Sequence, residues 1–366
     1  MPDSISESAS KSQVSSPSRL RKKRPCLSTL VLSTLFPVLV AVLAFHLDSF
    51  QPGPIPIHEL TQSPMSVSLR NDRMLEGAEF VGSGELLGPE DLAYDSKSQL
   101  IYTGCQDGWV KRVRLNDSAV DKWVNTHGRP LGVALGHNGE AIVADGYKRW
   151  RNRDANGRGG RAEIQNYRRS RCSTECVWDV LEGKPHGRFM SFDPITRKTR
   201  VLVADLYFPN GVAVSPSQDS VILCETVMRR CRKYYTEGNK QGELESFVDN
   251  LPGLPDSIKY DGDGHYWIAL ATGNSAVFDL AMRHAFIRKI MGMMEKYIGG
   301  LPKGNDAGVL VVDMEGDPVA HYYDHKLCSV TSAMKIGNRV YCGSVVYSHI
   351  MSLDLDQYPA SPTVSV

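Results

Sequence analysis

The sequence lacks the local motifs that mark several large enzyme classes. It has no G-x-S-x-G nucleophile elbow, which argues against the common serine-hydrolase arrangement. It has neither a P-loop nor a G-x-G-x-x-G loop for nucleotides. An excess of one charge is missing as well, because 42 Lys and Arg balance 41 Asp and Glu to a net charge of +1. The whole chain therefore has no electrostatic preference for nucleic acid or acidic ligands.

The eight cysteines are scattered and do not form a disulfide framework. Cys172 and Cys176 are separated by three residues but lack nearby His or Cys partners at zinc-finger spacing. An oxidising compartment would permit disulfides, yet a domain of this size does not need them, and we expect buried free thiols. The only N-x-S/T site begins at Asn116, and we predict its glycosylation if the site is lumenal and exposed.

The N-terminus joins a polar tail to one long apolar run. Five basic residues lie between Arg19 and Arg24, and the nineteen residues from Leu27 to Phe45 carry no charge. A run of this length is enough to cross a bilayer as a helix, and basic flanks stay cytosolic. We therefore predict a cytosolic tail at 1–24 and a transmembrane signal anchor at 25–47.

This topology predicts a type II protein of the endoplasmic reticulum membrane, with the bulk of the chain in the lumen. A cleaved signal peptide is the alternative, and cleavage would send the protein to the vacuole or outside the cell. The apolar run is long and no clear A-x-A site follows it, which favours the uncleaved anchor.

Five stretches repeat one pattern of a strand, a turn and a second strand. They are "PEDLAYDSKSQLIYTG", "PLGVALGHNGEAIVAD", "PNGVAVSPSQDSVILCE", "PDSIKYDGDGHYWIAL" and "VTSAMKIGNRVYCGS". One variable position near the start of each stretch recurs at intervals of roughly forty residues or roughly twice that, as Glu90, Leu131, Asn210, Asp256 and Thr331. Antiparallel units of this period are typical of a β-propeller.

We therefore predict an all-β fold, a six-bladed β-propeller over residues 84–358 whose third blade is incomplete. A linker and propeller entry at 48–83 precede it, and a tail at 359–366 follows. Residues 276–297 are apolar at helical spacing, so a helical insertion there explains one of the two long intervals. Its Met and Phe face is expected to pack on the propeller, and the alternative is insertion into the membrane surface.

The other long interval contains the basic run Lys148–Cys172, with nine Lys or Arg against two acids. The run shows no strand periodicity and occupies the place of an expected inner hairpin, while "RFMSFD" and "TRVLVADL" behind it read as outer strands. A nucleic-acid site is disfavoured, because a lumenal domain rarely meets nucleic acid. The hypothesis we favour is a reading-frame or splicing accident, and a genuine basic insertion is the alternative.

The inner strands of a propeller border its central channel, so residues at one repeat position converge there. Glu90, Asn210 and Asp256 are all oxygen donors, and such a set suits a hard cation such as Ca²⁺. The alternative role is to satisfy buried backbone groups at the channel mouth. His127 and His186 are weaker candidates for a general base. The "DGDG" stretch at 261–264 lacks the rest of an EF-hand loop and is predicted to be a hairpin turn.

Longer motifs carry a family resemblance. At "DLYFPNGVAVSPSQDSVILCETVMRRCRKYY", "LPGLPDSIKYDGDGHYWIAL", "HGRPLGVALG" and "LEGKPHGRFMSFDP", the chain resembles plant strictosidine-synthase-like proteins, which are relatives of the adipocyte plasma membrane-associated protein. The resemblance implies a six-bladed propeller on a signal anchor. The wider group includes calcium-dependent lactonases and arylesterases such as paraoxonase and the regucalcin-type gluconolactonase.

The resemblance also assigns roles to single positions. It puts Glu90, Asn210 and Asp256 at metal-ligand positions of the calcium-dependent relatives, whereas the phrase that supplies a fourth ligand there is absent. Strictosidine synthase uses a glutamate where this chain has Thr331, and a hydroxyl cannot replace a carboxylate in proton transfer. The expected function is metal-assisted hydrolysis of a small ester or lactone in the channel, impaired by the incomplete blade. A non-catalytic ligand-binding propeller is the alternative, and strictosidine synthase activity is less favoured.

Overall fold

The computed structural model describes residues 27–56, 63–136, 141–145, 161–165, 172–193, 196, 198–299, 301 and 304–362. The chain divides into two compact units, Met1–Asp48 and Ser49–Val366. In the first unit, helix α1 covers Leu27–Leu47 and contains Pro37, and its side chains are described from Ser33 onward. Within the described residues, no helix is both long and apolar enough to cross a bilayer.

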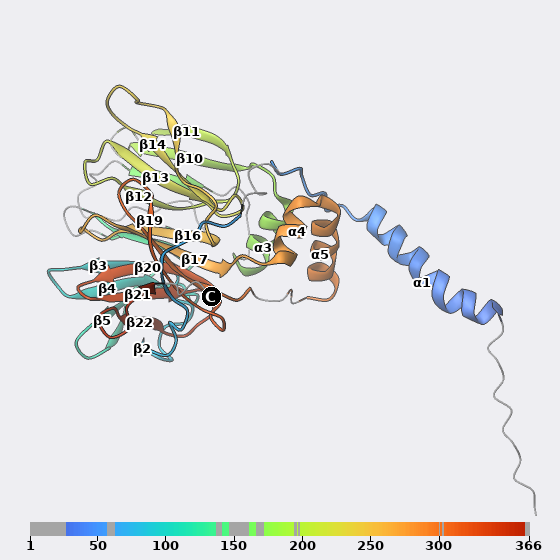
Figure 1. Cartoon of the computed structure of the whole chain (residues 1–366), viewed down its shortest axis with the longest axis horizontal. Helices are drawn as coiled ribbons and strands as arrows, with labels where there is room; N and C mark the ends of the chain where they lie inside the picture. Colours follow the sequence, from blue (N-terminus) through green and yellow to red (C-terminus); the bar gives the residue numbers. More distant parts are fainter. Residues whose placement is uncertain are drawn as a thin grey trace, which may run out of the picture. The chain divides into compact units, whose positions relative to one another are not determined.

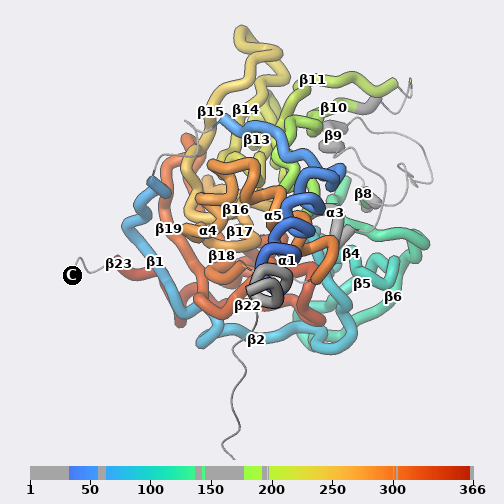
Figure 2. The backbone as a smooth tube through the Cα atoms, turned by 90° about the vertical axis from the view of Figure 1, so that its right-hand side faces the viewer, coloured from blue at the N-terminus to red at the C-terminus, as the bar shows by residue number. Residues whose placement is uncertain are grey.

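The strands of the second unit form six sheets among the residues described, and Figure 2 shows them arranged around a common centre. The first sheet holds β3 (Leu92–Asp95), β4 (Leu100–Gly104), β5 (Trp109–Arg114) and β6 (Val120–Asn125). The fourth holds β12 (Pro209–Val214), β13 (Ser220–Glu225), β14 (Arg230–Tyr235) and β15 (Leu244–Val248). Both are four-stranded blades, and β13 is buried at every position whereas β6 at the edge of its sheet is mostly exposed.

The last two sheets in the chain bring the two ends of the propeller together. The fifth holds β16 (Gly253–Tyr260), β17 (Tyr266–Gly273), β18 (Ala307–Val312) and β19 (Pro318–Asp324), then β1 (Leu69–Asn71) and β23 (Ser361–Pro362). The sixth holds β20 (Val330–Ile336), β21 (Arg339–Ser344), β22 (Ile350–Asp354) and β2 (Ala78–Val81). Because β2 pairs with β22, a strand from the start of the domain completes the final blade.

The region between the first and fourth sheets differs from the others. Strands β7 (Pro130–Leu135) and β8 (Ala141–Asp145) form the predicted second hairpin, without further partners among the described residues. The third sheet holds β9 (Arg161–Gln165), β10 (Gly187–Asp193) and β11 (Lys198–Leu206), in the order β11-β10-β9. The two predicted outer strands are confirmed as β10 and β11.

The expectation that the basic run contains no strand is wrong at one place. Its segment Arg161–Gln165 forms β9, which pairs antiparallel with β10 along five positions and lies beside β12 of the next sheet. A free strand edge pairs through backbone groups, which do not require a periodic side-chain pattern. The rest of the run before β9 lies outside the described residues, so its origin stays a hypothesis.

Among the described residues of the second unit, three helices accompany the sheets. The predicted insertion is confirmed as α4 (Ala276–Arg283) and α5 (Ala285–Tyr297), separated at His284. A further helix, α3 (Cys172–Glu182), was not predicted and contacts α5. Figures 1 and 2 show α3, α4 and α5 together at one end of the sheets.

The prediction that the Met and Phe face of the α4–α5 insertion packs on the propeller is confirmed in part. Ala281 and Met282 are buried against Val227 and Met228 of the loop between β13 and β14. In contrast, Phe286 is 57% exposed and Met294 is 46% exposed.

Cysteines divide into a bonded pair and free thiols. Cys224 and Cys231 form a disulfide, which corrects the expectation of free thiols at these positions; they lie directly opposite each other on β13 and β14. Cys105 and Cys342 are free and buried, as predicted. Burial raises the pKa of the Cys105 thiol to about 12, so this group is an inert part of the core.

Candidate functional site

The repeat's variable position coincides with a β-bulge in four of the inner strands. The pairing register shifts at Leu131 in β7, at Asn210 in β12, at Asp256 in β16 and at Thr331 in β20. Glu90 lies two residues before β3 of the first sheet. A bulge unpairs one residue and turns its side chain away from the ordinary alternation of a strand. The variable position of the sequence repeat thus corresponds to a β-bulge that recurs in four inner strands.

The bulges lie at the helical end of the sheets. Gly253, the first residue of β16, pairs with Gly273, the last residue of β17. Helix α4 starts at Ala276, three residues later, so the start of β16 and the helices share one end. Asp256 is three residues into β16 and therefore belongs to this end, which we call the bulged end of the channel.

Backbone contacts bring neighbouring bulges together. A Cβ atom on Gly211 would lie 2.5 Å from the carbonyl oxygen of Asp256, so only glycine fits beside Asn210, where β12 meets β16. On the other side, the Thr331 hydroxyl donates a hydrogen bond of 2.8 Å to the carbonyl oxygen of Glu90. The backbones of adjacent inner strands therefore approach one another closely at these repeat positions.

Glu90 faces a buried cation. Its Oε2 lies 3.4 Å from Nη2 of Arg129, and the two side chains are 18% and 5% exposed. Arg129 also donates to the carbonyl oxygen of Gly88 at 3.3 Å. The guanidinium, contributed by the residue before β7, neutralises this carboxylate within the protein.

Asp91 joins the inner strands of four sheets. Its Oδ2 accepts hydrogen bonds from the backbone N–H of Val133 and from Nζ of Lys259, both at 3.0 Å. Its Oδ1 accepts one from the Ser332 hydroxyl at 3.0 Å. Asp91 is not among the site residues predicted from the sequence. Its neighbour Glu90 was selected by repeat position, but nothing in "PEDLAY" shows that Lys259, on a distant strand, lies against Asp91.

The two histidine candidates lie away from this cluster. His127 is exposed in the turn between β6 and β7, where its φ is +53° and its backbone N–H donates to Asn125 Oδ1 at 2.7 Å. His186 is also exposed, with Nε2 3.6 Å from Glu182 Oε2 after helix α3. No contact joins either ring to a bulged residue in the described part of the chain. Their proposed role as general base has no support from this geometry.

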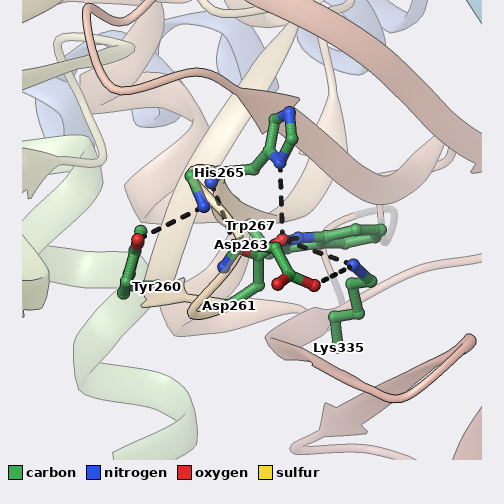
Figure 3. A network of polar contacts seen from close by, with 7 residues as sticks. Tyr260, Asp261, Asp263, His265, Trp267 and Lys335 are labelled. Carbon is green, nitrogen blue, oxygen red and sulfur yellow. Dashed lines mark hydrogen bonds and ion pairs between the residues drawn. The ribbon is translucent and has the colours of Figure 1, made fainter.

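The "DGDG" stretch is a hairpin turn, as predicted, and its first carboxylate is fully engaged (Figure 3). Asp261 accepts hydrogen bonds from the backbone N–H groups of Asp263 and His265 and from Trp267 Nε1 at 3.1 Å. Lys335 Nζ approaches it to 3.7 Å. Burial opposes ionisation of Asp261, but these hydrogen bonds and Lys335 hold its pKa below the ordinary value. The carboxylate stabilises the turn.

The oxygen donors of the bulged end fit a hard cation in part. Asn210 and Asp256 supply amide and carboxylate oxygens on neighbouring strands, which Ca²⁺ prefers. The Ser257 hydroxyl beside them is buried without a hydrogen-bond partner among the described residues. Glu90, the third predicted metal ligand, instead pairs with the guanidinium of Arg129. The described residues contain no cluster of three His, Cys, Asp or Glu side chains suited to a metal, so any ion there depends on neutral oxygens.

Comparisons with known proteins decide the family. The family model for strictosidine synthase matches residues 166–239, and that for the strictosidine-synthase-like N-terminal region matches 70–113. STRICTOSIDINE SYNTHASE-LIKE 4 of Arabidopsis thaliana is 47% identical over 360 residues, covering 90% of this chain and 96% of that protein. The chain belongs to the strictosidine-synthase-like family.

More distant relatives agree with this placement. The adipocyte plasma membrane-associated protein of Gallus gallus is 29% identical over 70% of this chain and 72% of its own length. Among solved structures, a gluconolactonase from Xanthomonas campestris has a TM-score of 0.52 at 13% identity, covering 80% of this chain and 96% of that one. At this identity the likeness shows the fold alone. The strictosidine-synthase-like chain therefore has the propeller fold that its sequence repeat predicts.

Proposed function

We propose that this strictosidine-synthase-like propeller hydrolyses a small ester or lactone bound at the bulged end of the channel. The observation that carries the proposal is the recurrence of a bulge at the residues that supply Asn210 and Asp256, beside the buried Ser257 hydroxyl. These three side chains would hold a Ca²⁺ ion. A bound cation of this kind polarises a carbonyl group and lowers the pKa of water.

Two other carboxylates of the bulged end are paired with cations of the protein. Arg129 faces Glu90 at 3.4 Å, and Lys259 faces Asp91 at 2.9 Å. In this proposal Glu90 and Asp91 act as positioning groups that hold the inner strands, and they are not ligands of the ion.

Turnover of phenyl acetate and simple lactones, with and without a chelator, tests the proposal. We expect hydrolysis that is lost with the chelator, restored by Ca²⁺, and reduced at least about a hundredfold in Asp256→Asn. Asp263→Asn is the matched control, because that carboxylate is 73% exposed in a turn. Hydrolysis that persists in both the chelator and Asp256→Asn would refute the mechanism.

A non-catalytic ligand-binding propeller is the second candidate. The internal neutralisation of Glu90 and Asp91 favours it, because a site built for binding a neutral molecule needs no free charge. Binding of the substrate panel without any turnover would select this candidate. Strictosidine synthase activity is disfavoured for two reasons. Thr331 is only 4% exposed, and its hydroxyl already donates a hydrogen bond to the carbonyl oxygen of Glu90.

We further propose that the predicted signal anchor at 25–47, whose side chains the structure describes only from Ser33 onward, holds the protein in the endoplasmic reticulum membrane with the propeller in the lumen. Three features support this: the uncharged run from Leu27 to Phe45 after a basic cluster, the Cys224–Cys231 disulfide, which oxidising compartments permit, and the exposed position of Asn116. Resistance to alkaline extraction together with an endoglycosidase-sensitive mass shift is the expected result. A protein released by alkali and lacking the shift would instead have a cleaved or unused leader.

A further inference from the structure

An apolar cavity adjoins the bulged end within the sixth sheet. Its volume is about 140 Å³, and its lining includes Phe80, Val330, Cys342, Tyr347, His349 and Met351. A cavity of about 150 Å³ with an apolar lining stays dry and accepts benzene in a well-studied protein of another fold. The volume here therefore matches a single six-membered ring.

The floor of the cavity is the inner part of the blade. Val330 is 1% exposed, Cys342 3% and Met351 4%. Val330 directly precedes Thr331, and a Cβ atom on Gly343 would lie 2.7 Å from the carbonyl oxygen of Glu90. The cavity is therefore adjacent to the bulged end, one residue away from it along β20.

The rim is aromatic. The rings of Phe80 and His349 are 4.3 Å apart between centroids, and the Tyr347 and His349 rings stack at 5.4 Å. Phe80 is 50% exposed, so this side chain faces both solvent and the cavity mouth. Aromatic faces and edges attract a further ring in offset or edge-to-face geometry.

The cavity is also uncharged near neutral pH. Burial lowers the pKa of His349, raises that of Tyr347 to about 12, and raises that of the Cys342 thiol. All three groups are therefore neutral, and none supplies a counter-ion. A charged ligand would lose its hydration here without compensation.

We propose that this cavity binds a neutral aromatic ring of about the size of benzene, held against the sixth blade beside the channel. The inference concerns binding alone and stands whether or not the chain hydrolyses esters. Its occupant is a small neutral aromatic compound or the aromatic part of a larger neutral molecule.

Binding to the full chain in detergent micelles tests the proposal, with benzene and benzoate as probes and detergent alone as the blank. We expect benzene to raise the melting temperature in a saturable way, and benzoate of the same ring size to have no effect. Val330→Phe, which fills the floor, and Phe80→Ala, which removes the rim, should each weaken the benzene response about tenfold or more. Val214→Ala, at an exposed position of β12, should leave it unchanged.

Equal responses to benzene and benzoate would overturn the proposal, and so would an unchanged benzene response in Phe80→Ala. That variant remains decisive if Val330→Phe fails to fold, because the Phe80 side chain is half exposed. Ester turnover, measured separately on the same variants, distinguishes a failure of this inference from a failure of the proposed hydrolysis.

Discussion

Single residues at the bulged end carry both the fold and the proposed chemistry. Glu90, Asn210 and Asp256 were selected by repeat position alone, and the structure places Asn210 and Asp256 in equivalent bulges. Asp91 and Ser257 were not found, because their significance depends on contacts between strands far apart in sequence. A repeat pattern shows which positions correspond, but not which charges meet when the ring closes.

Removing the Asp91 carboxylate should destabilise the propeller. Asp91→Ala leaves Lys259 and the backbone N–H of Val133 without their acceptor, and we expect a loss of about 2–4 kcal/mol in the free energy of unfolding. Asp121→Ala is the matched control, because Asp121 pairs with Arg112 at the exposed outer strand, where such pairs contribute about 0–1 kcal/mol. Denaturant titration measures the free energy of unfolding of both variants. Equal losses would contradict the role of Asp91 in joining the inner strands.

His321 should make the stability depend on pH. Burial lowers its pKa to about 4, and its ring stacks on Tyr323 in β19. Between about pH 6.5 and 4 the unfolded chain therefore binds a proton that the folded chain does not, so stability falls as the pH is lowered through this window. The loss should reach about 2–3 kcal/mol.

Comparing unfolding curves at pH 7 and pH 4.5 for the wild type and His321→Gln measures this contribution. The variant should lose part of the pH dependence in that window. An unchanged dependence would mean that other groups account for it.

At the scale of elements, the local patterns predicted hairpins well and irregular segments poorly. All five repeated hairpins are present because each has period-two strands around a turn. Helix α3 was missed, since "CSTECVWDVLE" is short and follows the basic run. Strand β9 was missed because it is defined by its pairing with β10.

The α4–α5 insertion should contribute to stability through one face only. Met282 is 2% exposed in the cluster with Val227 and Met228, so Met282→Ala should cost about 2–4 kcal/mol. Met294 is 46% exposed, and Met294→Ala should change stability by less than about 0.5 kcal/mol. Thermal melts of the two variants would disprove the assignment of faces if Met294→Ala proved the more harmful.

At the scale of the whole molecule, a strand from the start of the domain completes the last blade, whereas two other sheets have fewer than four strands among the residues described. Strand β2 completes the blade formed by β20, β21 and β22. The β7–β8 sheet has two strands and the β9–β11 sheet three among the residues described. Propeller blades stabilise one another by packing face to face, so a blade with fewer strands leaves its neighbours with fewer contacts.

This chain should therefore be less stable than a relative with complete blades. We expect its Ser49–Val366 unit to melt at least about 5 °C below the corresponding part of STRICTOSIDINE SYNTHASE-LIKE 4 under the same conditions. Equal melting temperatures would contradict this expectation. Sequencing the transcript across codons 145–178, with peptide evidence for the run, separates a genuine insertion from a splicing accident.

The cation proposed at the bulged end is tested most directly by equilibrium dialysis of the purified protein against Ca²⁺. We predict one bound ion per chain, lost in Asp256→Asn and retained in Asp263→Asn. Absence of binding, or binding that is equal in the two variants, would contradict the assignment of Asn210, Asp256 and Ser257 as the cation site.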